Sequence, residues 1–153
     1  MRHFLRLFIL SFMLVTATAQ SDSVTIEDPW VREGPPGMAM LAGFMIVRND
    51  GKEARSITAA EGPDYDHVEL HRSIMKDGMA RMIPQESIPV PPGGSVALKP
   101  GDYHLMLMQP KRPLVAGDSS EITLILDDGT RLTVNAPVKK GDGGMMHHHH
   151  HHE

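Results

Sequence analysis

Four side chains have the types and spacing expected of a soft-metal site. Ten residues separate His71 from Met82, and one residue separates His104 from Met106. Imidazole nitrogen and thioether sulfur, with no carboxylate among them, favour Cu(I) over zinc, magnesium or calcium. Two His and two Met suit a tetrahedral d10 ion and leave the site at a charge of only +1. Such a site would hold Cu(I) and still release it to an acceptor with Cys thiolates.

The sequence contains no cysteine. Its absence excludes a thiol nucleophile, a blue-copper centre, and any zinc or iron–sulfur site built from Cys. Thioethers do not form disulfides, although they can be oxidised to sulfoxides, so a Met-based site tolerates an oxidising compartment. No Ser/His/Asp grouping stands out either, and we expect no enzyme activity.

The second pair of candidate ligands belongs to a short strand that begins at Tyr103. Every second residue from Tyr103 to Leu107 is aromatic or aliphatic, and this set is expected to face the core. His104 and Met106 then lie together on the opposite face, because alternate side chains of a strand point the same way. Met108 shares that face and is a weaker ligand candidate.

The first pair is positioned by a hairpin within residues 68–83. The dipeptide Asp77-Gly78 predicts a two-residue turn, which pairs position 71 with 84 and position 73 with 82. His71 and Met82 become diagonal neighbours on one face, about 7–8 Å apart at Cα. A three-residue loop would turn one strand over and separate them.

Other side chains could also take part in the site or lie beside it. Glu69 lies on the face of His71, where it either orients the ring as a hydrogen-bond acceptor or is solvated. His67 is expected to be a solvated residue at the start of the strand. Four methionines either form a soft apolar rim around the site or simply pack: Met38, Met40, Met75 and Met79.

The elements that must carry these residues are short strands. Apolar runs recur between Pro- and Gly-containing turns, and helical patterning is almost absent. Strands are expected at residues 24–26, 42–48, 55–59, 68–74, 80–83, 95–98, 103–108, 121–126 and 131–137, and residues 88–94 read as a Pro-rich turn. Eight or nine such strands predict one all-β domain, either a β-sandwich or a Greek-key barrel.

Several segments resemble the periplasmic copper chaperones called PCu(A)C. They are Val68-Glu69-Leu70-His71, Pro92-Gly93-Gly94, residues 101–108 and the long spacing of the four candidate ligands. The resemblance extends from about residue 24 to 138. It implies a cupredoxin-like Greek-key β-sandwich with one Cu(I) ion bound by His71, Met82, His104 and Met106. It also implies delivery to the CuA centre of cytochrome c oxidase, alone or with a Sco-type thiol protein.

Residues 1–19 have the features of a secretory signal peptide. Arg2 and Arg6 form a positively charged region before an apolar run at residues 7–15, and Ala17-Thr18-Ala19 fits a cleavage site. The run is too short to span a bilayer, and no Cys follows it to carry a lipid, so we expect a periplasmic protein without a membrane anchor. The copper-binding domain would then occupy residues 20–138.

The charge of the remaining chain limits its partners. Two of the 15 basic residues and none of the 19 acidic residues fall within residues 1–19, so the rest carries a net charge of −6. Basic residues form no stripe, and there is a single Trp. Nucleic acid and anionic lipid are therefore not expected partners.

Residues 139–153 form a Gly-rich, polar tail with a Met/His-rich end. A native tail of this composition would be a flexible metal-gathering arm that also takes Cu(II). An affinity tag is the alternative, and the retained leader and Glu153 after the His run favour the native reading. Its accessory ligands would be Met145, Met146, His147, His148, His149, His150, His151 and His152.

Two functions besides a copper chaperone stay open. A periplasmic copper-sequestering or resistance protein would store metal in the Met/His tail. A β-sandwich adhesion or interaction module would carry its His and Met residues incidentally.

Overall fold

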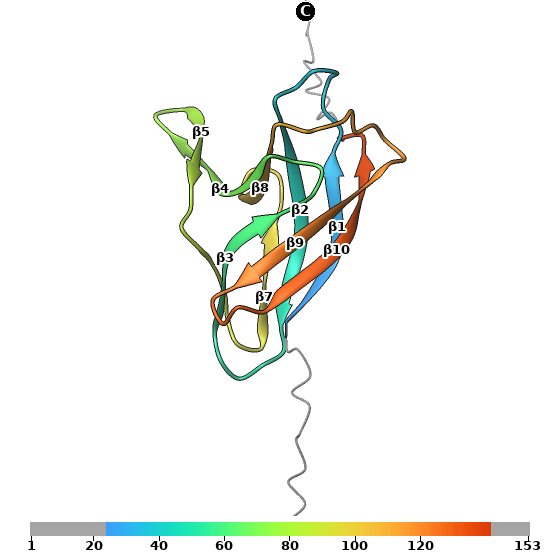
Figure 1. The fold of residues 1–153 in the computed structure, drawn as a ribbon. Helices are drawn as coiled ribbons and strands as arrows, with labels where there is room; N and C mark the ends of the chain where they lie inside the picture. The colour runs from blue at the N-terminus through green and yellow to red at the C-terminus, as the bar shows by residue number, and fades with distance from the viewer. Residues whose placement is uncertain (1–23, 142–153) are drawn as a thin grey trace, which may run out of the picture.

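A computed structural model describes residues 24–141, which form ten strands and no helix (Figure 1). No helix in this part of the chain is therefore long and apolar enough to cross a membrane. The strands are β1 (Val24–Arg32), β2 (Met40–Asn49), β3 (Arg55–Glu61), β4 (His67–Lys76), β5 (Met79–Pro84), β6 (Ile88–Val90), β7 (Gly94–Leu98), β8 (Tyr103–Met108), β9 (Ser119–Leu126) and β10 (Arg131–Lys139).

The strands follow the order β5-β4-β8-β2-β1-β10-β9-β3-β6, and β7 pairs with β2. A further pair, Ala60↔Val68, joins β3 and β4, each of which is the second strand from an end of this path. The sheet thus closes on itself as a flattened barrel, with β9 and β10 crossing in front of β1 and β2 in Figure 1. The all-β single domain predicted from the turn spacing is confirmed.

The core lies between the facing walls of the barrel. Its fully buried members come from most of the strands: Val31, Val47, Ile57, Ile88, Val90, Leu105, Leu107, Ile122, Leu124 and Ala136. Period-2 alternation explains this set, because one side chain in two faces inward along each strand. In a chain without disulfides, the burial of these aliphatic side chains is the main stabilising contribution.

A polar network ties the β3–β4 and β8–β9 loops to β9. The Tyr65 hydroxyl donates to Ser120 Oγ at 2.9 Å, and Ser120 donates to Asp64 Oδ2 at 3.0 Å. Arg112 Nε donates to Asp64 Oδ1 at 2.9 Å. The Arg112 guanidinium, and secondarily the Ser120 hydroxyl, hold the pKa of Asp64 below its ordinary value.

β6 corrects the prediction that residues 88–94 are only a turn. Ile88 and Val90 are fully buried, while Pro89 between them is exposed. The strand pairs only with β3 and ends the strand order, where a proline is tolerated because no second neighbour needs its N–H. The proline content hid an alternation of only three residues.

β1 is longer than the three residues predicted for it. Its pairing with β2 shifts register between Glu27 and Trp30, and Asp28 has a φ of 47°. This irregularity has the character of a β-bulge, which breaks the alternation that a sequence pattern relies on. Beyond it the strand continues to Arg32.

Candidate metal centre

β8 presents His104 and Met106 from the middle of the sheet, between β4 and β2. Leu105 and Leu107 are fully buried in the core, as the alternation predicts. His104 and Met106 point to the opposite face, yet they are only 3% and 7% exposed. Both faces of β8 are therefore covered at these positions. The sequence had indicated only that the face with His104 and Met106 is not the core face.

β4 brings His71 directly opposite His104. The two residues are register partners in the antiparallel β4–β8 pair, and such partners point to the same side of a sheet. Their ring centroids lie 5.9 Å apart, and His71 is 8% exposed. In the same register Met106 lies opposite Glu69, so it is a diagonal neighbour of His71. We call the side of β4, β5 and β8 that carries these residues the donor face.

Each of the two histidines uses one ring nitrogen for a hydrogen bond. His71 Nε2 is 2.7 Å from Glu69 Oε2, and His104 Nδ1 is 3.0 Å from the backbone oxygen of Asp102. Both partners are acceptors, so these nitrogens carry the protons and donate. His71 Nδ1 and His104 Nε2 are then the lone-pair nitrogens, and both are buried without a hydrogen-bond partner. A buried polar atom in this state is destabilising, and a metal ion would satisfy both.

Glu69 is hydrogen-bonded to both histidines of β4. Its Oε1 lies 3.1 Å from His67 Nε2 while its Oε2 accepts from His71. The hydrogen bond from His71, and then that from His67, hold the pKa of Glu69 below its ordinary value. Of the two readings of Glu69, the structure supports the one in which it orients His71. His67 itself is exposed, as expected.

The predicted hairpin register is the one observed. His71 pairs with Pro84 and Ser73 pairs with Met82. Asp77 and Gly78 have φ values of 53° and 73°, which fit a type I′ turn. Met82 therefore lies on the donor face, diagonal to His71.

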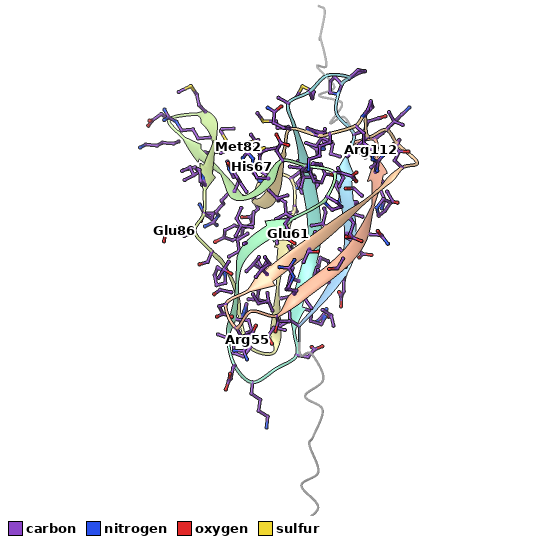
Figure 2. All side chains as sticks on the ribbon, in the orientation of Figure 1. Arg55, Glu61, His67, Met82, Glu86 and Arg112 are labelled. Atoms are coloured by element: carbon purple, nitrogen blue, oxygen red, sulfur yellow. The ribbon has the colours of Figure 1, made fainter. Side chains whose placement is uncertain are left out.

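Met82 nevertheless differs from the other three candidate ligands. Its strand is the edge of the sheet, every residue of β5 is exposed, and Met82 is 60% exposed. In a flat sheet of this register, its Cα would be about 16 Å from that of Met106, beyond the span of two Met side chains sharing one ion. The structure brings together His71, His104 and Met106 on two paired strands. It leaves Met82 on the hairpin of β4 and β5, beside which Figure 2 labels it.

The other methionines of the region divide between the two faces. Met40 pairs with Met108 across β2 and β8, and both lie on the donor face. Met75 is also on this face. Met79 pairs with Lys76 and points to the other side of the hairpin. Met40, Met75 and Met79 are all exposed, as is Met38 in the β1–β2 loop, so none of these four fills the core.

Aromatic residues of β1 and β2 flank the donor face, and the sequence alone did not identify them. Phe44 follows the last β2–β8 pair, Gly43↔Leu105, and so lies level with His104 on the same face. It is buried, and the Trp30 ring lies 4.7 Å from it. The Arg32 guanidinium lies 5.2 Å from the Phe44 ring centroid. The alternation of β2 contained the signal, but the pairing of β2 with β8 was needed to place it.

Other metal-binding groupings are lacking in the described part of the chain. Among residues 24–141, no three His, Cys, Asp or Glu side chains are arranged to hold a metal ion. The predicted signal peptide at residues 1–19 and the accessory ligands at 145–152 lie outside the described residues.

Comparisons with known proteins found a matching family model and a related protein sequence. A family model described as "Putative lipoprotein LpqE-like" matches residues 24–138. The putative lipoprotein Lxx21020 of Leifsonia xyli subsp. xyli is 33% identical over 129 residues, which cover 84% of this chain and 76% of that protein.

Solved structures share its fold. The solution structure of Cu(I)-DR1885 from Deinococcus radiodurans is 32% identical, with a TM-score of 0.61, over 82% of this chain and 85% of that one. The copper-bound PCuAC domain from PmoF2 is 23% identical, with a TM-score of 0.66, over 78% of this chain and 94% of that one. The fold is thus the cupredoxin-like β fold of PCuAC domains, which confirms the predicted fold class.

Proposed function

The chain belongs to the LpqE-like family, and we propose that it is an exported, non-enzymatic copper chaperone with one Cu(I) site. The proposed ligands are His71, Met82, His104 and Met106. The similar solved structures include a copper-bound PCuAC domain, from PmoF2, and the Cu(I) form of DR1885.

One observation carries the proposal. Two buried imidazole nitrogens, His71 Nδ1 and His104 Nε2, belong to residues directly opposite each other and have no hydrogen-bond partner. The thioether of Met106 is buried on the same face. Both rings are held through their other nitrogen, which leaves these two nitrogens to bind a soft ion. Neutral nitrogen and sulfur donors favour Cu(I).

The ligand set also favours transfer over storage. Four neutral ligands lack the negative charge by which thiolates bind copper tightly, so passage to an acceptor with Cys ligands is downhill. We propose the CuA centre of cytochrome c oxidase as the final acceptor, reached directly or through a Sco-type thiol protein, with the periplasm as the compartment.

Anaerobic competition with a chromophoric Cu(I) chelator tests the site. We expect one tightly bound Cu(I) per chain, and loss of that binding in His104→Ala and in Met106→Ala. Met79→Ala is the control, because this thioether points away from the donor face. If His104→Ala and Met106→Ala bind as tightly as the parent, the ligand assignment is wrong.

Truncation after Gly144 separates transfer from sequestration. The truncated chain should still bind one Cu(I) and pass it to a soluble CuA domain, which can be followed by the absorption of the loaded acceptor. Loss of all copper binding on truncation would instead favour a sequestering protein that uses the Met/His tail.

A further inference from the structure

The hairpin that carries Met82 extends beyond the body of the sheet. β4 is paired with β8 only as far as Arg72, which lies opposite Tyr103. Residues 73–76 and 79–82 pair only with each other, apart from Ser73 N–H, which donates to the Asp102 oxygen at 3.1 Å. We call residues 73–82 the ribbon, and it projects at the upper left of Figure 1.

The ribbon has little to hold it in one position. An isolated two-stranded ribbon is marginally stable in water, because it buries little apolar surface. Here the side chains are exposed except for Ser73 and Ile74, which are half-buried. Segments with few buried contacts open at low free-energy cost. The ribbon can therefore bend at its base, near Arg72 and Ile83, while the pairing of β4 with β8 stays intact.

The three other donors are held firmly by contrast. His104 and Met106 belong to a strand with a neighbour on each side, and His71 belongs to β4, which is flanked by β8 and β5 at that position. Each imidazole is fixed through its second nitrogen by Glu69 or by the backbone of Asp102. These three residues are buried, so they form the preorganised part of the site, whereas Met82 is exposed to solvent.

We infer that copper binds in two steps, first to His71, His104 and Met106, and then to Met82 as the ribbon closes over the ion. This inference rests on the proposed function and specifies how the same site loads and unloads. Release runs in reverse, with Met82 as the first donor to leave. An incoming thiolate of the acceptor would then take the coordination position that Met82 vacates, on the exposed side of the site.

The two-step scheme makes a kinetic prediction. Closure follows binding, so removing the Met82 thioether leaves the rate of copper capture unchanged and accelerates release. The whole loss of affinity then appears in the dissociation rate. We expect Met82→Leu to release Cu(I) about tenfold faster than the parent and to bind it about tenfold more weakly. This factor corresponds to a closed position of the loaded ribbon that is populated about tenfold more than the open one. Leu retains most of the side-chain volume, so the hairpin should still form.

Stopped-flow mixing of the full chain with Cu(I), and of the loaded chain with a competing chelator, measures the two rates under anaerobic conditions. Amide hydrogen exchange supplies a second readout, since closure should protect residues 73–82 on copper loading in the parent but not in Met82→Leu. Met79→Leu is the matched control, because it removes a thioether of nearly equal exposure, 57% against 60%, from the opposite face of the same ribbon.

Three outcomes would count against the inference, and they are distinguishable from failure of the proposed function. If Met82→Leu slows capture, the Met82 thioether is part of the entry site and the order is wrong. If Met82→Leu behaves as Met79→Leu does, Met82 is not a closing donor. If copper leaves the exchange of residues 73–82 unchanged in the parent, the ribbon does not close. Failure of the parent to bind Cu(I) would instead overturn the proposed function itself.

Discussion

His71 and His104 lie directly opposite each other on β4 and β8, with ring centroids 5.9 Å apart and one buried, unpartnered nitrogen on each ring. Their second nitrogens are bonded to acceptors, a side-chain carboxylate for His71 and a backbone carbonyl for His104. This arrangement fixes both tautomers before any metal arrives.

Glu69 should set the copper affinity through His71. We expect Glu69→Gln to weaken Cu(I) binding about tenfold, because a neutral amide holds the imidazole N–H less strongly and lowers the basicity of the ligating nitrogen. Chelator competition measures the affinity, and nitrogen NMR of the His71 ring reports its tautomer. His67→Ala is the control, since it removes only the other hydrogen bond of Glu69. Equal effects of the two substitutions would contradict the role of Glu69.

The fluorescence of the single Trp should report copper binding. The Trp30 ring packs against that of Phe44, with centroids 4.7 Å apart, and Phe44 lies level with His104 on the donor face. An ion held by His71 and His104 changes the surroundings of this pair, so emission should change with a stoichiometry of one Cu(I) per chain. His104→Ala should abolish the change. A titration in which emission responds equally in His104→Ala would place the bound copper elsewhere.

Asp64 should stabilise the fold in a pH-dependent way. Its pKa is lowered from an ordinary value of 3.8, chiefly by the hydrogen bond from Arg112. A lowered pKa means that this stability is present above pH 3.8 and is lost as the pH falls toward the folded-state value. We expect Asp64→Asn to lower the free energy of unfolding at pH 7 by about 1–2 kcal/mol, and by less at pH 3.

Denaturant unfolding at several pH values checks this prediction. Asp66→Asn serves as the control, because this neighbouring residue is exposed and belongs to none of the observed side-chain hydrogen bonds. If Asp64→Asn loses as much stability at pH 3 as at pH 7, the link between the ionisation of Asp64 and the stability of the fold is rejected.

Two glycines should respond differently to Ala. Gly78 has a φ of 73° and open space around its Cβ position, so Gly78→Ala should cost about 1 kcal/mol through backbone strain alone. That loss should appear as faster amide exchange in residues 73–82, with little change in global unfolding. At Gly62 a Cβ would lie 2.7 Å from the Glu121 oxygen, so Gly62→Ala should destabilise the whole domain. Equal global effects would show that the ribbon unfolds together with the barrel.

Much of the fold was predictable because its signals are local. Alternation over a few residues predicted that Leu105 and Leu107 face the core and that His104 and Met106 share the other side. The Asp77-Gly78 dipeptide predicted the hairpin register that pairs Ser73 with Met82, since a two-residue turn leaves no freedom in pairing. The same rules failed where local regularity is broken, at the bulge of β1 and at the three-residue strand β6.

The candidate ligand types and their spacing were readable from the sequence alone, because donor chemistry and strand periodicity are properties of the residues. Tertiary structure decided which of them meet. The pairing of β4 with β8 spans three intervening strands, and only this pairing sets His71 opposite His104, buries both rings and leaves one nitrogen of each without a partner. It also ends at Arg72, and for that reason Met82 stands apart on an exposed ribbon while the other three residues are buried in the sheet.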